Sequence, residues 1–158
     1  MNTDNGPKDK LAITKIIFGT VIDHIPNKMS FKISSILNLQ NSNGAIAVIS
    51  SAKSRNMGKK DIVKIEGKHL NSGELDKIAL LAPGATINII DDGKVISKTL
   101  LSTPAQVSGI LKCFNPNCIT NHEKTITKFK TTSSTPLKMR CIYCERTFDE
   151  DILGRMIK

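Results

Sequence analysis

Hydrophobic and polar positions along the first forty residues predict a strand followed by a helix. The segment 11–19 is apolar and rich in isoleucine, which indicates a buried strand. The segment 23–26 is expected to form a turn, because Pro26 restricts the residue before it to extended backbone. From 27 to 39, apolar residues recur at helical spacing, so we expect a helix there.

The next sixty residues predict a second helix and further strands. Asn71 followed by Glu74 is the capping signal of a helix that continues to Ala82. Asp92 and Gly93 form a dipeptide typical of a tight hairpin turn. Four strands are expected, at 45–52, 60–68, 85–90 and 94–101.

This order of elements predicts a ferredoxin-like fold in the first part of the chain. The order β-α-β-β-α-β gives an antiparallel sheet with two helices on one face, and the hairpin adds a strand. The other face of the sheet is then free. A free sheet face usually packs against a partner, which favours a homodimer through this domain.

The chain divides into a tail, two domains and a linker. Residues 1–10 have mixed charge and nothing to bury, which predicts a disordered tail. The first domain spans 11–101, and a short linker follows at 102–106. Helical periodicity is absent from 107–158, where we expect a small all-β domain. It has too few large apolar residues to fold without a bound metal or disulfide bonds. The whole chain is therefore predicted to be α+β.

In this interpretation four cysteines bind a metal ion that stabilises the small second domain. Their spacing is Cys113-x4-Cys118 and Cys141-x2-Cys144, and two close pairs separated by a β-rich insert suit a tetrahedral zinc ribbon. Four thiolates leave no open coordination position, so one Zn²⁺ per chain would be structural. Two disulfides, four independent thiols and an iron–sulfur cluster are the alternatives.

Composition and charge exclude some classes of protein. No apolar run approaches the roughly 20 residues of a membrane span, and the charged first ten residues do not predict a secretory signal. We therefore expect a cytoplasmic protein with reduced thiols. The net charge is +9 but is spread along the chain, whereas nucleic-acid binders more often carry a dense basic stripe.

Three lysines of the first domain are candidates for anion binding. Lys60 and Lys64 fall on one face of a predicted strand with Ile62 between them, about 13 Å apart at 3.3 Å per residue. That spacing suits an extended nucleotide, and Lys98 on the last strand could join them. The alternative is three solvated lysines. Asp23 and His24 form either a turn cap or a functional pair, and no catalytic signature accompanies them.

Five segments in this order resemble the regulatory chain of aspartate carbamoyltransferase: 19–26, 57–66, 82–88, 113–120 and 141–145. The resemblance implies a non-catalytic subunit with a nucleotide-binding domain and a zinc domain. It implies a homodimer through the first domain and contact of the second with catalytic trimers, in a dodecamer that controls pyrimidine synthesis. CTP is expected to inhibit, ATP to activate and UTP to reinforce CTP, with no nucleic acid or membrane as partner.

The resemblance also assigns the site residues. It places Asp23 and His24 near the triphosphate and its metal, Lys64 at the base and ribose, and Lys98 at the phosphates. Lys60 matches a second basic contact near the same site. Other positions are expected to line the base and ribose: Ile13, Ile16, Ile62, Asn88, Ile90 and Val95. Base preference stays open, since Thr14, Phe18 and Gly93 differ in type from the best-known members.

The runner-up hypothesis is a basic zinc ribbon that binds nucleic acid. It rests on five basic residues of the second domain: Lys124, Lys128, Lys130, Lys138 and Arg140. Aromatic residues that would stack on bases are scarce, because the chain has one tyrosine and no tryptophan.

Overall fold

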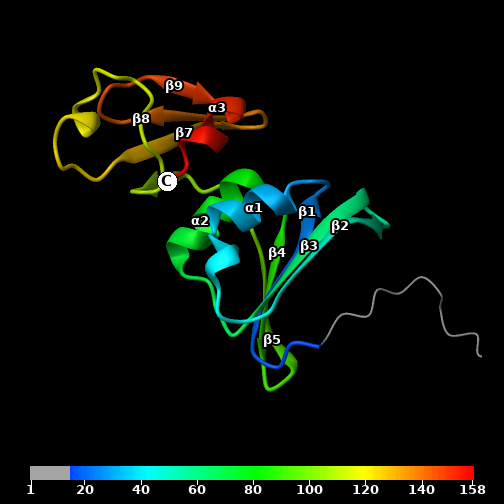
Figure 1. Cartoon of the computed structure of the whole chain (residues 1–158). Coiled ribbons are helices and arrows are strands. Elements are labelled where there is room, and N and C mark those ends of the chain that lie inside the picture. The colour runs from blue at the N-terminus through cyan, green and yellow to red at the C-terminus, as the bar shows by residue number, and fades with distance from the viewer. Residues whose placement is uncertain (1–14) are drawn as a thin grey trace, which may run out of the picture.

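The computed structural model describes residues 15–158 and arranges them as two antiparallel sheets with short helices (Figure 1). The first sheet has the strand order β2-β3-β1-β4-β5, and the second has the order β6-β7-β8-β9. The α+β prediction is confirmed. The predicted tail, Ile13 and the start of the predicted strand at 11–19 lie outside the described residues.

The first domain contains five strands, two α-helices and one 3₁₀ turn. Its strands are β1 (Gly19–Pro26), β2 (Ile46–Ser54), β3 (Gly58–Glu66), β4 (Thr86–Asp91) and β5 (Lys94–Leu100). Its helical elements are α1 (Ser30–Ile36), η1 (Leu39–Asn41) and α2 (Ser72–Leu81). The helix predicted at 27–39 is therefore shorter than expected and is followed by the separate turn η1.

The first strand lies further along the chain than the hydrophobic pattern predicts. Residues 15–18 are not in a strand, and Ile17 and Phe18 are exposed. The strand β1 instead begins at Gly19 and continues through the segment 23–26 that was predicted as a turn, and its Ile22 and Ile25 are fully buried. The segment predicted as a turn contains a β-bulge instead. His24 has a φ of 57°, and the register of β1 against β3 shifts between Ile22 and Ile25.

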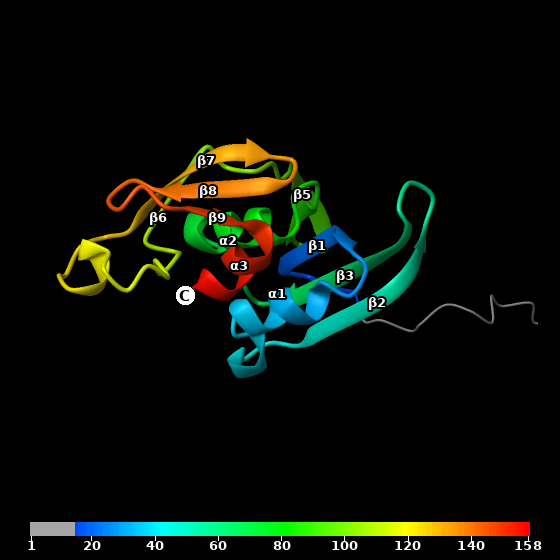
Figure 2. The ribbon, with the colours of Figure 1, turned by 90° about the horizontal axis from the view of Figure 1, so that it is seen from above.

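One face of the first sheet is covered by both helices (Figure 2). Ile22, Val63 and Ile87 point to this face and pack against Ile33 of α1 and Ile78 of α2. Each fully buried side chain of this size stabilises the fold by about 1.5–3 kcal/mol. Residues of the opposite parity point to the other side of the sheet, which we call the open face.

The second domain contains four strands, a 3₁₀ turn and a helix that the sequence did not predict. They are β6 (Gln106–Ser108), η2 (Ile119–Asn121), β7 (Lys128–Ser134), β8 (Leu137–Cys141), β9 (Thr147–Asp149) and α3 (Glu150–Met156). Two acidic residues in the first turn of α3 and Arg155 in its last turn complement the helix dipole. Leu153 and Met156 of α3 complete a core around Phe129 and Met139.

A side chain of the first domain also belongs to this second core. Leu80, near the end of α2, is buried together with Phe129, Leu137 and Leu153. The two domains are therefore packed against each other and are not simply joined by a linker. None of the helices in the described part of the chain has the length and apolar character that a bilayer span requires.

Candidate functional sites

The four cysteines converge on one point in the second domain. Their sulfur atoms all lie within 4.8 Å of one another. Sγ of Cys113 is 3.7 Å from Sγ of Cys144, and Sγ of Cys118 is 3.8 Å from Sγ of Cys141. These separations far exceed the roughly 2.05 Å of a disulfide bond. The arrangement is that of a metal-ligand set, and the disulfide alternative does not fit it.

Hydrogen bonds in the two cysteine loops hold the ligands in place. The side-chain amide of Asn121 donates to the carbonyls of Cys113 and Asn115, at 2.9 and 2.8 Å. In the second loop the Glu145 amide donates to the carbonyl of Cys141 at 2.9 Å, and Glu145 has a φ of 64° that closes the turn. Both loops are thus shaped by the protein so that the sulfur atoms point inward.

Three of the thiols, those of Cys113, Cys141 and Cys144, differ in acidity. Burial raises the pKa of Cys113 and of Cys141 above the ordinary range of a thiol. Burial also acts on Cys144, but hydrogen bonds, first from the Asn115 side chain and then from the Arg146 backbone, lower its pKa to about 7. Of these three thiols Cys144 is therefore the one that loses its proton most readily, and metal binding requires thiolates.

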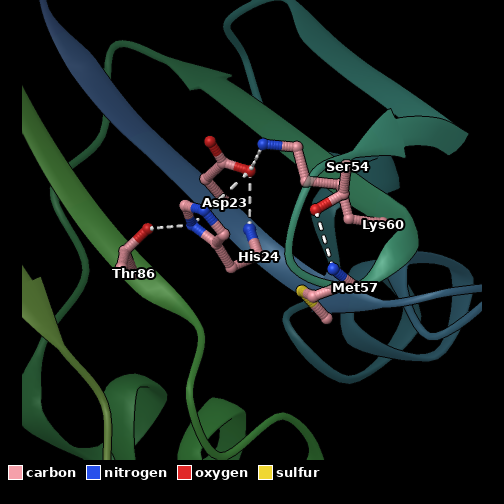
Figure 3. Close-up of polar contacts among 6 residues, drawn as sticks. All are labelled: Asp23, His24, Ser54, Met57, Lys60 and Thr86. Atoms are coloured by element: carbon pink, nitrogen blue, oxygen red, sulfur yellow. Dashed lines mark hydrogen bonds and ion pairs between the residues drawn. The ribbon is translucent and has the colours of Figure 1, made fainter.

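A polar cluster on the first domain joins β1, β3 and β4 (Figure 3). Nζ of Lys60 lies 2.9 Å from Oδ1 of Asp23, and Nδ1 of His24 lies 3.0 Å from Oγ1 of Thr86. Burial raises the pKa of Asp23, but the hydrogen bonds from Lys60 and from the His24 amide and the charge of Lys60 lower it overall. The cluster thus keeps a carboxylate, an ammonium, an imidazole and a hydroxyl together.

The sheet register aligns three more of the predicted residues in one row across the open face. Lys64 on β3 pairs with Val21 on β1, Val21 pairs with Asn88 on β4, and Asn88 pairs with Lys98 on β5. At about 4.8 Å between strands the row spans roughly 14 Å. In this row Val21 lies two residues from Asp23 on β1, and Asn88 lies two residues from Thr86 on β4. The row is therefore next to the polar cluster on the same face of the sheet.

The remaining predicted residues lie around this row. Lys60, Ile62 and Lys64 are partly exposed while the residues between them, Asp61 and Val63, are buried, which confirms that the three share one face. Ile90 pairs with Val95 at the far end of β4 and β5, beyond Asn88 and Lys98. Ile16 is buried in the segment before β1. The structure therefore gathers ten of the eleven predicted positions in one domain, and Ile13 lies outside the described residues.

Thr86 is a member of the cluster that the sequence analysis missed. Its hydroxyl contacts His24, and Thr86 stands opposite Asp23 in the pairing of β1 with β4. The signal was present in the sequence, since Thr86 lies two residues before Asn88 on a predicted strand and must share its face.

Apolar side chains are exposed in the loops that carry the cysteines. Tyr143 and Ile142 lie between two ligands, and the Tyr143 hydroxyl donates to the carbonyl of Ile126 at 2.9 Å. We call this group the loop surface; its exposed members are Phe114, Ile119, Ile126, Ile142 and Tyr143. Exposed apolar patches of this kind mark interaction sites.

Two family models match the chain and together cover most of it. The model described as aspartate carbamoyltransferase regulatory chain, allosteric domain, matches residues 11–102. The model described as aspartate carbamoyltransferase regulatory chain, metal binding domain, matches residues 105–153.

Curated relatives with the same description are similar over nearly their whole length. The aspartate carbamoyltransferase regulatory chain of Thermococcus sibiricus is 50% identical over 144 residues, which are 91% of this chain and 95% of the relative. That of Thermococcus kodakarensis is 49% identical over 148 residues, 93% of this chain and 97% of the relative. That of Sulfolobus acidocaldarius is 47% identical over 148 residues, 92% of this chain and 90% of the relative.

Proposed function

This chain belongs to the family of aspartate carbamoyltransferase regulatory chains, and from that premise we propose that it binds CTP and ATP, with UTP as a further effector, and transmits their effect to the catalytic subunits. Membership makes it a non-catalytic subunit with an allosteric domain and a metal-binding domain. The proposal assigns 11–101 to nucleotide binding, 102–106 to a linker and 107–158 to contact with the catalytic chain. The location proposed is the cytoplasm, where thiols stay reduced.

The observation that carries the proposal is the row of Lys64, Asn88 and Lys98 that runs into the cluster of Asp23, His24 and Lys60. Lysines stand at both ends of the roughly 14 Å row and Lys60 stands in the adjoining cluster, an arrangement that suits an extended ligand with anionic groups. We assign Lys98, Lys60 and His24 to the phosphates, with Asp23 beside the metal ion that accompanies them. We assign Lys64 and Asn88 to the ribose and base.

The apolar part of the site is assigned to the base and ribose. Ile62 lies beside Lys64 on the open face, and Ile90 with Val95 extends the sheet beyond Asn88. Ile13 and Ile16 precede β1 in the chain and complete the proposed lining. A bound nucleotide shifts the holoenzyme only as far as its affinity differs between the two states of the assembly.

Zinc is the metal that we propose for the cysteine site. A tetrahedron with zinc–sulfur bonds of about 2.3 Å has sulfur–sulfur edges of about 3.8 Å. The separations of 3.7 and 3.8 Å between thiols fit these edges and suit a single ion better than a larger iron–sulfur cluster. With Cys113, Cys118, Cys141 and Cys144 as ligands, the ion would hold the two loops together and take no part in chemistry.

The quaternary part of the proposal has three regulatory dimers joining two catalytic trimers. The loop surface supports the contact with a catalytic chain, because its apolar side chains lie on loops that the metal would fix. The edge strand β5 supports the homodimer. Ile96 and Leu100 on this strand are 61% and 68% exposed, and an unpaired edge with apolar side chains is a surface for self-association.

The nucleic-acid alternative lacks support from the geometry and the relatives. Of its five basic residues, Arg140 is paired with Glu145 at 3.2 Å. Stacking side chains are also scarce, since the chain has one tyrosine and no tryptophan. All of the relatives described above are regulatory chains.

The decisive experiment mixes the zinc-loaded chain with its cognate catalytic trimer. Mass and carbamoyltransferase rate are then measured with and without CTP or ATP. A large complex whose rate responds to the nucleotides is expected, and a Lys64→Ala chain should form the same complex with a weaker response. A complex without any response would leave a scaffold, and absence of a complex despite bound zinc would refute the proposal.

A further inference from the structure

Asp61 is a completely buried carboxylate in the first domain, with an exposure of 0%. It lies on β3 between Lys60 and Ile62, two residues that belong to the proposed nucleotide site. In the part of the chain that the structure describes, no cation lies within ion-pair distance of it. Burying a carboxylate costs several kcal/mol unless hydrogen bonds replace its water.

Hydrogen bonds from two other elements replace that water. Oδ2 accepts from the Ser30 amide at 3.1 Å and from the Ser30 hydroxyl at 2.5 Å, at the start of α1. Oδ1 accepts from the Ser51 amide at 2.9 Å, inside the bulge of β2. Although burial raises the pKa of Asp61, these donors and the Lys28 amide lower it overall. The carboxylate is therefore held charged in the protein interior.

The donors come from segments whose backbone needs to be held. Ser51 has a φ of 61° and Lys28 a φ of 72°, which are left-handed conformations that cost free energy for residues other than glycine. The Ser51 hydroxyl also donates to Oδ1 of Asn27 at 2.7 Å, which links the β2 bulge to the loop before α1. Asp61 thus fixes the bulge and the helix start in one arrangement.

The same arrangement determines where Lys60 stands. Consecutive strand residues point to opposite faces, so an Asp61 anchored on the buried side directs Lys60 to the open face. There the Lys60 ammonium lies 2.9 Å from Asp23. Lys60 also pairs with Pro26, and Asp61 pairs with Ile25, immediately after the bulge at His24 in β1. Asp61 therefore lies next to Lys60 on β3 and opposite Ile25, the residue that follows His24 on β1.

From this geometry we infer that Asp61 is a positioning residue for the phosphate end of the nucleotide site. Its buried hydrogen bonds to Ser30 and Ser51 keep Lys60 and His24 placed for a polyphosphate, without any contact of Asp61 with the ligand. The inference rests on the proposed function and goes further, because it assigns a role to a residue that does not face the open side. It also predicts that phosphate binding is affected more strongly than base binding.

The test compares CTP with cytidine as calorimetric probes of the full, zinc-loaded chain. Asp61→Asn keeps the size of the side chain but loses its charge and turns one acceptor into a donor that faces N–H groups. We expect CTP affinity to fall by about tenfold or more, the size of a lost charge-assisted hydrogen bond, while cytidine affinity stays nearly constant. The ratio of the two affinities is a readout that a purely structural role would leave unchanged.

Two further variants keep the test decisive. Ser30→Ala removes one donor and leaves the carboxylate, so it should change the ratio of CTP to cytidine affinity less than Asp61→Asn does. If Asp61→Asn does not fold, Ser30→Ala serves as the test variant. Asp76→Asn makes the same chemical change on α2 and should leave the ratio unchanged. A folded Asp61→Asn or Ser30→Ala chain with the wild-type ratio would overturn the inference. A wild-type chain that binds neither CTP nor cytidine would instead overturn the proposed function.

Discussion

Leu80 and Leu81 are consecutive residues at the end of α2, and their side chains pack into different hydrophobic cores. Leu80 is buried in the core of the second domain, whereas Leu81 packs against the core of the first. The chain then enters β4 at Thr86, the residue whose hydroxyl contacts His24. A short stretch of chain therefore connects the polar cluster with the packing of the metal-binding domain.

Leu80→Ala should weaken communication between the domains more than nucleotide binding. Truncating a buried leucine costs about 2–5 kcal/mol of stability, here lost from the second core. We expect CTP affinity to stay near the wild-type value and the effect of CTP on the holoenzyme rate to shrink. Calorimetry and rate measurements check this. Leu75→Ala, on the same helix but packed only against the first core, is the matched control and should keep the response.

Removing the metal should unfold the second domain and spare the first. Structural zinc contributes on the order of 10 kcal/mol in small metal-binding domains. Three of the cysteines are also buried members of the second core. After chelation we expect the NMR signals of β7 and β8 to collapse, CTP binding to persist and association with catalytic trimers to be lost. Re-addition of Zn²⁺ should restore the NMR signals and the association with catalytic trimers. Association that survives chelation would contradict the prediction.

Local signals in the sequence predicted several elements well. The capping box of α2 forms as expected, with the Glu74 amide donating to Asn71 at 2.9 Å and the Asn71 amide donating to Glu74 at 3.4 Å. Asp92 and Gly93 have φ values of 50° and 71°, which is the left-handed pair of a tight hairpin turn. The cysteine spacing predicted the cluster. In each of these cases a few neighbouring residues determine the geometry.

The predictions failed where residues that are distant in sequence determine the local structure. The run at 11–19 is more apolar than β1, but Thr20 and Ile22 of β1 have strand partners on both sides, in β3 and β4. Pairing with two strands outweighs local hydrophobicity. The buried role of Asp61 was equally hidden, because its donors Ser30 and Ser51 are distant in sequence and a lone aspartate on a strand predicts exposure.

The ion pair of Asp23 and Lys60 should be visible in an acid titration. Because the pKa of Asp23 is lowered in the folded protein, its contribution to stability is complete above the ordinary pKa of 3.8 and is lost as the pH falls through the folded value. Asp23→Asn should therefore cost more stability near neutral pH than well below 3.8. Carboxyl ¹³C NMR should give a midpoint below 3.8 for Asp23 and one above 3.8 for Asp76, which burial raises.

Lys60→Ala supplies the control for that titration. It should raise the midpoint of Asp23 and leave that of Asp76 unchanged, since Asp76 lies on α2. Equal midpoints for Asp23 in the two proteins would show that the pair does not form in solution.

Lys98→Ala should separate phosphate binding from stability. Lys98 is exposed on the edge strand β5, so its removal should leave the unfolding temperature almost unchanged. Because it supplies one charge to the row on the open face, we expect CTP affinity to fall by about tenfold and its dependence on salt to become weaker.

The matched control lies on the same strand. Lys94 pairs with Asp91 next to the hairpin turn, and the bulge in β5 places Lys98 with Val95 on the open face and Lys94 on the opposite one. Lys94→Ala should therefore bind CTP like the wild type, and both variants should bind cytidine alike. Equal loss of CTP affinity in the two variants would mean that the lysines act through the net charge of β5 and not as a defined site, and unchanged affinity in Lys98→Ala would remove Lys98 from the site.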